Sequence, residues 1–100
     1  MSKNHRIDAA VETVHWGYFD AALEPLATVE SGATVTITTV SGRPEEMPKP
    51  PLVVPEALRE IHRSVAMKLP GHICTGPVAI AGAQPGDVLE VRIKDIALHY

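Results

Sequence analysis

The chain has 100 residues, of which 45% are hydrophobic and 21% are charged, and its formal net charge is −3. This length holds one small domain, and the composition is that of a folded globular protein, which excludes disordered and fibrous classes. The nine Lys and Arg residues are scattered singly, so a nucleic-acid partner is not expected. One cysteine, Cys74, cannot form an internal disulfide.

The N-terminal sequence contains no apolar run of the signal-peptide type, and no segment approaches the roughly 20 apolar residues that span a bilayer. We therefore expect no membrane insertion and a cytoplasmic location. Nine prolines and seven glycines interrupt the chain, a pattern typical of short strands joined by turns. The sequence predicts a mainly β protein.

The first half of the chain predicts two strands. Residues 1–11 are polar and lack periodicity, so we expect a flexible lead-in. Residues 11–16 favour a short strand. Residues 32–40, GATVTITTV, favour a longer strand because β-branched residues alternate between its two faces.

A proline-rich loop and a helix follow. Residues 41–54 contain prolines that lack backbone donors, so this stretch is predicted to be a loop. Residues 55–66 are predicted to form a short amphipathic helix, because Leu58, Ile61 and Val65 recur at helical spacing. His62 is expected on the exposed side of that helix.

The last third of the chain predicts more strands. The sequence QPGD favours a turn, since Pro85 presets its own φ and Gly86 accepts a positive one. After the turn, Leu89, Val91 and Ile93 alternate with charged residues, which predicts a half-buried strand. The pattern continues almost to Tyr100 without a closing turn, so we expect the chain to be part of a larger architecture.

Two segments contain residues able to carry chemistry. In LPGHICTGPV, His72 lies two residues before Cys74, so the pair is open to interpretation as metal ligands, as nucleophile and base, or as two residues of one strand. In VHWGYFD, His15 is a candidate proton carrier or metal ligand. Asp20 can orient a histidine, although an aspartate there is also an ordinary turn former.

Three sequence blocks are distinctive together: HWGYFD, SGATVTI, and HICTGP with the PGD that follows it. They closely resemble the N-terminal part of the acetamidase/formamidase family. The resemblance implies a β-sandwich of the jelly-roll type, with the predicted short helix. It also implies hydrolysis of the C–N bond of small linear amides such as formamide or acetamide, with release of ammonia and a carboxylate. An oligomer, and in some relatives zinc or another divalent metal, are further implications.

The resemblance also assigns roles to residues. The catalytic candidates are His15, His72 and Asp20; the metal-ligand candidates are His15 and His72; the substrate-binding candidates are Trp16, Thr75 and Gly76. Thr75 is expected to donate a hydrogen bond to a substrate carbonyl, and Gly76 to allow close approach of the backbone. The alternative interpretation of residues 75–77 is a tight turn between strands. Cys74 occupies a position that is commonly apolar in the family, so we interpret it as a packing residue.

Family members are considerably longer, and the blocks of their later sections are absent from this sequence. We therefore expect residues 1–100 to form a single N-terminal part of the family domain, which acts as an amide hydrolase when complemented by the remaining part. The alternative hypothesis is a non-catalytic β domain that functions only by association. A homo-oligomer or a C-terminal partner chain is expected in either case.

Overall fold

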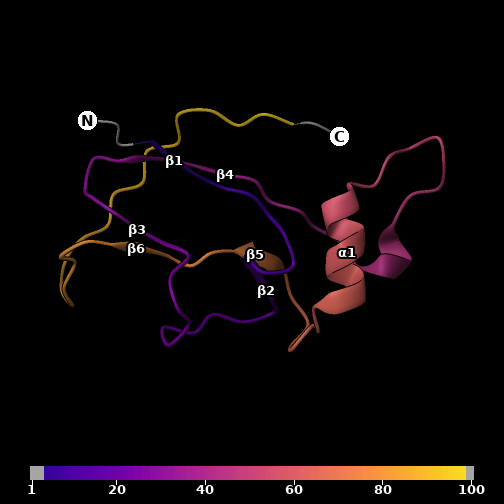
Figure 1. The fold of residues 1–100 in the computed structure, drawn as a ribbon, viewed down its shortest axis with the longest axis horizontal. Coiled ribbons are helices and arrows are strands. Elements are labelled where there is room, and N and C mark those ends of the chain that lie inside the picture. The colour runs from indigo at the N-terminus through magenta and orange to yellow at the C-terminus, as the bar shows by residue number, and fades with distance from the viewer. Residues whose placement is uncertain (1–3, 99–100) are drawn as a thin grey trace.

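A computed structural model of the chain describes residues 4–98. Its elements, in chain order, are β1 (Asn4–Ile7), β2 (Val14–Trp16), β3 (Ala27–Val29), β4 (Thr34–Ile37), the 3-10 turn η1 (Pro44–Glu46), α1 (Glu56–Ser64), β5 (Ile73–Thr75) and β6 (Val78–Ile80) (Figure 1). The predicted mainly β class with one short helix is confirmed.

The strands pair as three two-stranded sheets, each joining distant parts of the sequence. β1 pairs in parallel with β4, β2 pairs antiparallel with β5, and β3 pairs in parallel with β6. No sheet of the described residues closes into a barrel. The jelly-roll sandwich therefore stays a prediction.

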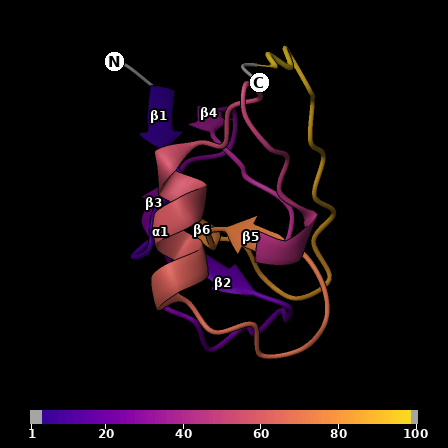
Figure 2. The same cartoon turned by 90° about the vertical axis from the view of Figure 1, so that its right-hand side faces the viewer.

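The main core lies where α1 packs against the β2–β5 sheet (Figure 2). Trp16 and Ile73 enter it from the two strands, and Leu58 and Ile61 enter it from the helix. Val54, at the end of the proline-rich loop, completes the buried cluster. The loop is thus fastened at one end by the same core that holds the helix.

The helix α1 forms as its sequence pattern predicts, with ends that are one or two residues shorter. Its buried residues, Leu58 and Ile61, are three apart and therefore share one face. Glu56 in the first turn and basic residues in the last turn complement the helix dipole. Among residues 4–98, no helix is both long enough and apolar enough to cross a membrane.

The N-terminal residues differ from the flexible lead-in that we expected. Residues 4–7 form β1, and its last residue, Ile7, is buried. The sequence NHRI shows no apolar alternation, so nothing in it predicts a strand. The strand forms because β4 supplies a parallel partner, in a register that places Ile7 beside Ile37.

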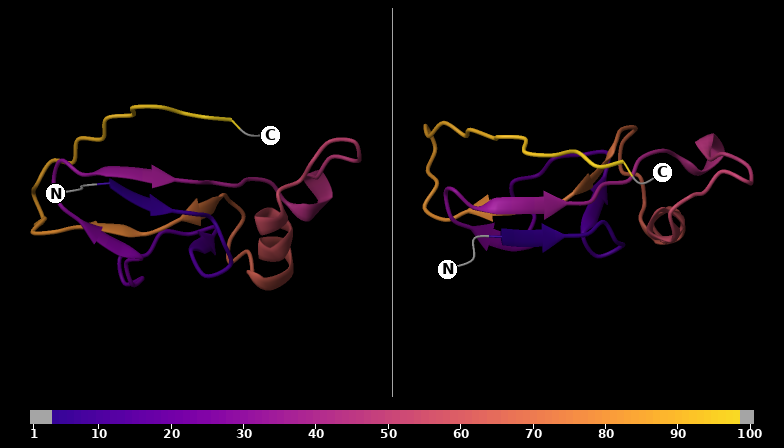
Figure 3. Two further views of the ribbon diagram at one scale, coloured as in Figure 1. Left: turned by 45° about the horizontal axis from the view of Figure 1, so that its top comes forward. Right: turned by 90° about the horizontal axis from the view of Figure 1, so that it is seen from above.

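The strand predicted after the QPGD turn is absent from the structure. Residues 88–98 adopt neither helix nor strand, and Figure 3 shows this yellow segment apart from the sheets in its left-hand view. Its large apolar side chains, which we expected to be half-buried, are between 67% and 93% exposed. Alternation predicts a strand only where a neighbouring strand accepts its hydrogen bonds, and the described residues supply none.

Shortening the central core residue tests this packing. Ile61 is 0% exposed, so Ile61→Ala is expected to lower the free energy of unfolding by about 2–4 kcal/mol through lost burial and a residual cavity. Leu52→Ala, in the exposed part of the proline-rich loop, is the control and should change it by less than about 0.5 kcal/mol. Urea denaturation measures both, and equal effects would contradict the described core.

Candidate functional site

The antiparallel pairing of β2 with β5 builds the candidate site. Its register places His15 opposite Cys74 and Trp16 opposite Ile73. Because successive side chains of a strand point to opposite faces, Trp16 and Ile73 enter the core while His15 and Cys74 face away from it. The histidine opposite Cys74 in the register is thus His15, from a distant segment. The Cys74 thiol itself donates to the backbone carbonyl of His72 at 3.9 Å.

A pocket of about 380 Å³ lies on that outer face. Four sequence-predicted site residues line it: His15, Asp20, Thr75 and Gly76. Cys74 also lines it, and the rest of its wall is apolar, including Phe19 and Pro77. The fold therefore brings together most of the predicted groups and adds a thiol to them.

His15 is partly buried and its imidazole is available for chemistry. Within residues 4–98, no group forms a hydrogen bond with its ring nitrogens. The ring lies 5.2 Å from that of Tyr18, centroid to centroid, and the Lys68 ammonium stands 4.9 Å from the centre of the same tyrosine ring. This cation–π contact helps to hold the tyrosine beside the histidine.

Asp20 lies at the exposed rim of the pocket and shapes a turn. One of its carboxylate oxygens accepts a hydrogen bond from the Ala22 N–H at 2.8 Å. Its carbonyl accepts another from the Leu23 N–H at 3.2 Å. This is the side chain-to-backbone turn typical of aspartate.

Thr75 differs from its expected role, because its hydroxyl proton is already used, and the Gly76 N–H is used as well. The Thr75 hydroxyl donates to the Thr38 carbonyl at 2.9 Å, and the Gly76 N–H donates to the Thr13 carbonyl at 3.0 Å. A hydroxyl has one proton, so Thr75 offers a ligand only its acceptor lone pairs. The expected donation from Thr75 to a substrate carbonyl does not fit this geometry.

Two predicted site residues lie outside the pocket. Trp16, expected to contact substrate, is 4% exposed and donates from Nε1 to the Gly71 carbonyl at 3.1 Å. The strand alternation that brings His15 outward is what turns this tryptophan inward. His72 is exposed, precedes β5, and engages β2 through its backbone carbonyl, which accepts from the Gly17 N–H at 3.0 Å.

Gly17 has the backbone role that its position predicts. Its φ is +90°, in the region that favours glycine, and a Cβ at this position would overlap the Leu69 carbonyl. The absence of a side chain lets residues 69–72 run tightly against the end of β2. That approach fixes the strand that carries His15.

One comparison with known proteins identifies the family of the chain. A model of the Acetamidase/Formamidase family matches residues 3–99. The chain belongs to this family. No curated protein and no solved structure matches the chain. The family is named for acetamidases and formamidases, which hydrolyse small amides.

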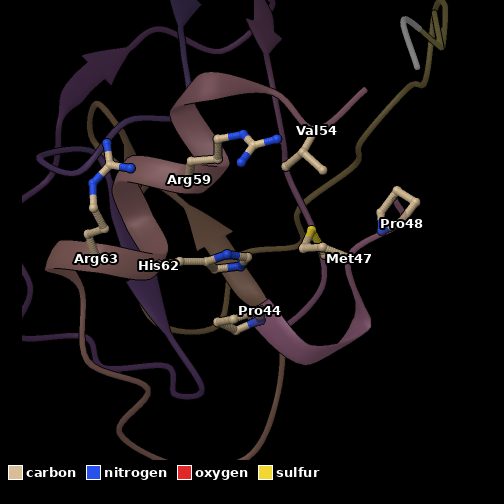
Figure 4. A pocket seen from close by; sticks show the side chains of 7 residues that line it. All are labelled: Pro44, Met47, Pro48, Val54, Arg59, His62 and Arg63. Carbon is tan, nitrogen blue, oxygen red and sulfur yellow. The ribbon is translucent and has the colours of Figure 1, made fainter. Parts of the chain in front are cut away.

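A second pocket of this acetamidase/formamidase chain, about 290 Å³ in volume, lies between η1 and α1. Figure 4 shows the residues that line it, among them Arg59, His62 and Arg63 from the helix. His62 is not on an exposed helix face as expected: its ring stacks on Trp16, and Nε2 donates to the Gly42 carbonyl at 2.9 Å. His62 thereby connects the proline-rich loop to the helix. None of the predicted site residues lines this second pocket.

The described residues do not fit a complete metal site. Within residues 4–98, no three His, Cys, Asp or Glu side chains are grouped so as to hold an ion, whereas protein zinc sites use three or four ligands. His15 and His72, the predicted ligands, do not share a pocket. The zinc or other divalent metal expected from the resemblance therefore has no set of ligands among residues 4–98.

The hydrogen bond that positions Thr75 at the pocket is testable. Thr75→Val keeps the shape but leaves the Thr38 carbonyl without its donor, so the free energy of unfolding is expected to fall by about 0.5–1.5 kcal/mol. Thr75→Ser retains the hydroxyl, so its free energy of unfolding should fall much less. Denaturant titration distinguishes the two variants, and equal losses would mean that the methyl group, not the hydrogen bond, matters.

Proposed function

We propose that this chain supplies part of the active site of an amide hydrolase that cleaves the C–N bond of small linear amides such as formamide or acetamide. The reaction consumes water and releases ammonia and a carboxylate. The observation that carries the proposal is the pocket in which the His15 imidazole, without a hydrogen-bond partner among residues 4–98, lies opposite Cys74 across paired strands, in a chain of the acetamidase/formamidase family.

His15 is the proton carrier in this proposal. An unactivated amide needs a base to deprotonate the attacking water and an acid to protonate the leaving amine. Imidazole performs both steps in turn, because its ordinary pKa lies near neutrality. Asp20, at the rim of the same pocket, contributes negative charge close to the imidazolium that forms between the steps.

Thr75 acts as an acceptor for the substrate. Its hydroxyl proton is bound to the Thr38 carbonyl, so the remaining lone pairs accept a hydrogen bond from the amide NH₂ group. Gly76 and Pro77 shape the wall beside it. The scissile nitrogen is thereby held on the β5 side of the pocket, opposite the strand that carries His15.

Stabilisation of the oxyanion needs donors that Gly76 and Pro77, on the β5 side of the pocket, do not supply. Hydrogen-bond donors aimed at the developing charge are the largest contribution in many acyl-transfer enzymes. Here the Gly76 N–H is already used by Thr13, and Pro77 has no N–H. We propose that a second copy of the chain or a C-terminal partner chain brings these donors, and with them any zinc or other divalent ion. The catalytic role of His72, which is outside the pocket, belongs to the same assembled state.

A second candidate function is a non-catalytic β domain that works only in association with itself or a C-terminal partner. The exposed apolar side chains of residues 88–98 favour it. Release of ammonia from formamide by the purified chain would exclude this alternative.

Substrate occupancy of the pocket can be measured without turnover. Iodoacetamide carries a primary amide and alkylates thiols, and Cys74 is the one thiol of the chain. We expect acetamide to slow this alkylation saturably in the folded chain, because both amides compete for the pocket. Mass spectrometry gives the rate, tert-butanol is the non-amide control, and the unfolded chain should show no protection. An alkylation rate independent of acetamide would overturn the assignment of the pocket.

Substitutions in the active assembly distinguish the catalytic contributions of His15 and His72. His15→Ala is expected to lower the rate of ammonia release by roughly 10²–10⁴-fold, the usual contribution of a general acid–base. His72→Ala lowers it only if the assembled state recruits that side chain. Unchanged rates of ammonia release in both variants would contradict the proposed proton-transfer roles.

A further inference from the structure

The pocket beside β2 and β5 offers more apolar wall than formamide or acetamide can cover. Four of its lining side chains are apolar: Phe19, Ala21, Leu23 and Pro77. Its volume of about 380 Å³ is that of roughly a dozen water molecules, at about 30 Å³ each in the liquid. Formamide carries no carbon substituent on its carbonyl, and acetamide carries only a methyl group. Neither amide fills this space.

A turn after β2 supplies most of the apolar wall. Residues 19–23 lie between β2 and β3 (Figure 1). The Asp20 carboxylate accepts from the Ala22 N–H at 2.8 Å, and the Asp20 carbonyl accepts from the Leu23 N–H at 3.2 Å. These hydrogen bonds fix the shape of the turn. The wall is therefore formed before a ligand arrives, as is usual for small-molecule sites.

Backbone hydrogen bonds also join this turn to the segment after β5, which forms the other wall. The Leu26 N–H donates to the Pro77 carbonyl at 2.9 Å, and the pairing of β3 with β6 starts at the next residue of each segment. The Gly76 N–H donates to the Thr13 carbonyl at 3.0 Å, directly before β2. The separation of the two walls is thus set by the fold itself.

The polar groups of the pocket orient an amide within it. In the proposed function, Thr75 accepts a hydrogen bond from the amide NH₂ group, and His15 serves the reacting carbonyl. The nitrogen of a primary amide carries only hydrogen atoms, so the remaining carbon atoms of the substrate belong to its acyl group. That group is the part left to contact the apolar side chains, and it gains free energy in proportion to the apolar area that it covers.

We propose that the preferred substrates of this pocket are primary amides whose acyl group is apolar and larger than acetyl, held against Phe19, Leu23 and Pro77. The inference rests on the proposed amide hydrolysis, because Thr75 and His15 must meet the amide group. Phe19 contributes the largest surface, since aromatic side chains dominate the apolar area of a contact. A polar acyl group is disfavoured, because these side chains offer no hydrogen bond in exchange for its water.

A series of amides measures this preference through Cys74, which lines the same pocket. Acetamide, propanamide and butanamide are each titrated against alkylation of the folded chain by iodoacetamide. Each added methylene should lower the half-protecting concentration roughly three- to fourfold. Butanamide should therefore protect at roughly a tenth of the concentration of acetamide. Glycolamide, with a hydroxyl in place of the terminal methyl of propanamide, should protect no better than acetamide.

Phe19→Ala removes the largest side chain of the wall. The advantage of butanamide over acetamide should fall from roughly tenfold to about threefold or less. This ratio is the readout, because it is insensitive to any change in the reactivity of the thiol itself. Phe19 is 91% exposed, so its replacement removes little packing, and circular dichroism checks the fold. Leu52→Ala, at an exposed residue that does not line the pocket, is the control and should leave the ratio unchanged.

The outcomes separate this inference from the proposed function. If acetamide protects Cys74 but the larger amides protect no better, or if Phe19→Ala leaves the ratio unchanged, the apolar acyl site is wrong while the pocket still binds an amide. If no amide protects Cys74, the assignment of the pocket to amides fails, and this inference fails with it. Butan-1-ol has a similar alkyl chain without the amide, and protection by it equal to that by butanamide would also overturn the proposal.

Discussion

The pairing of β2 with β5 is the constraint on which the rest of the structure depends. It is only three residues long on each strand, yet it decides which side chains are inside and which are outside. Its inner face supplies Trp16 and Ile73 to the core under α1. Its outer face supplies His15 and Cys74 to the pocket. A shift of the register by one residue would exchange the two faces, so the same register is required for both the core and the site.

The core also gives the site its rigidity. Trp16 is held by its hydrogen bond to the Gly71 carbonyl and by stacking on His62. His62 in turn reaches the Gly42 carbonyl in the proline-rich loop. Since His15 directly precedes Trp16, these contacts also restrain the backbone of His15. The proposed proton carrier therefore lies on a fixed strand and not on a loop, which preserves the orientation of its side chain.

The sequence predicts local features of this fold well, because they depend on local chemistry. The spacing of Leu58 and Ile61 predicts α1, the prolines predict the loop, and the HWGYFD and HICTGP blocks predict the family. It does not predict the neighbour of a strand. For that reason β1 was not expected, the strand after the QPGD turn was expected and is absent, and Cys74 was interpreted as packing when it faces His15 in the pocket. The signal that could have found the thiol is the register between two segments far apart in the chain, which no single pattern in one sequence contains.

The three strand pairs also determine how this chain must fold. β1 joins β4, β2 joins β5 and β3 joins β6, so each sheet requires the closure of a long loop, and no pair is a hairpin of consecutive strands. Chains whose contacts are this distant in sequence fold slowly, because the entropy of loop closure is lost before the contacts form. Among the described residues, the apolar segment at 88–98 has no strand to join. Apolar side chains that stay exposed while distant strands find one another favour aggregation during folding.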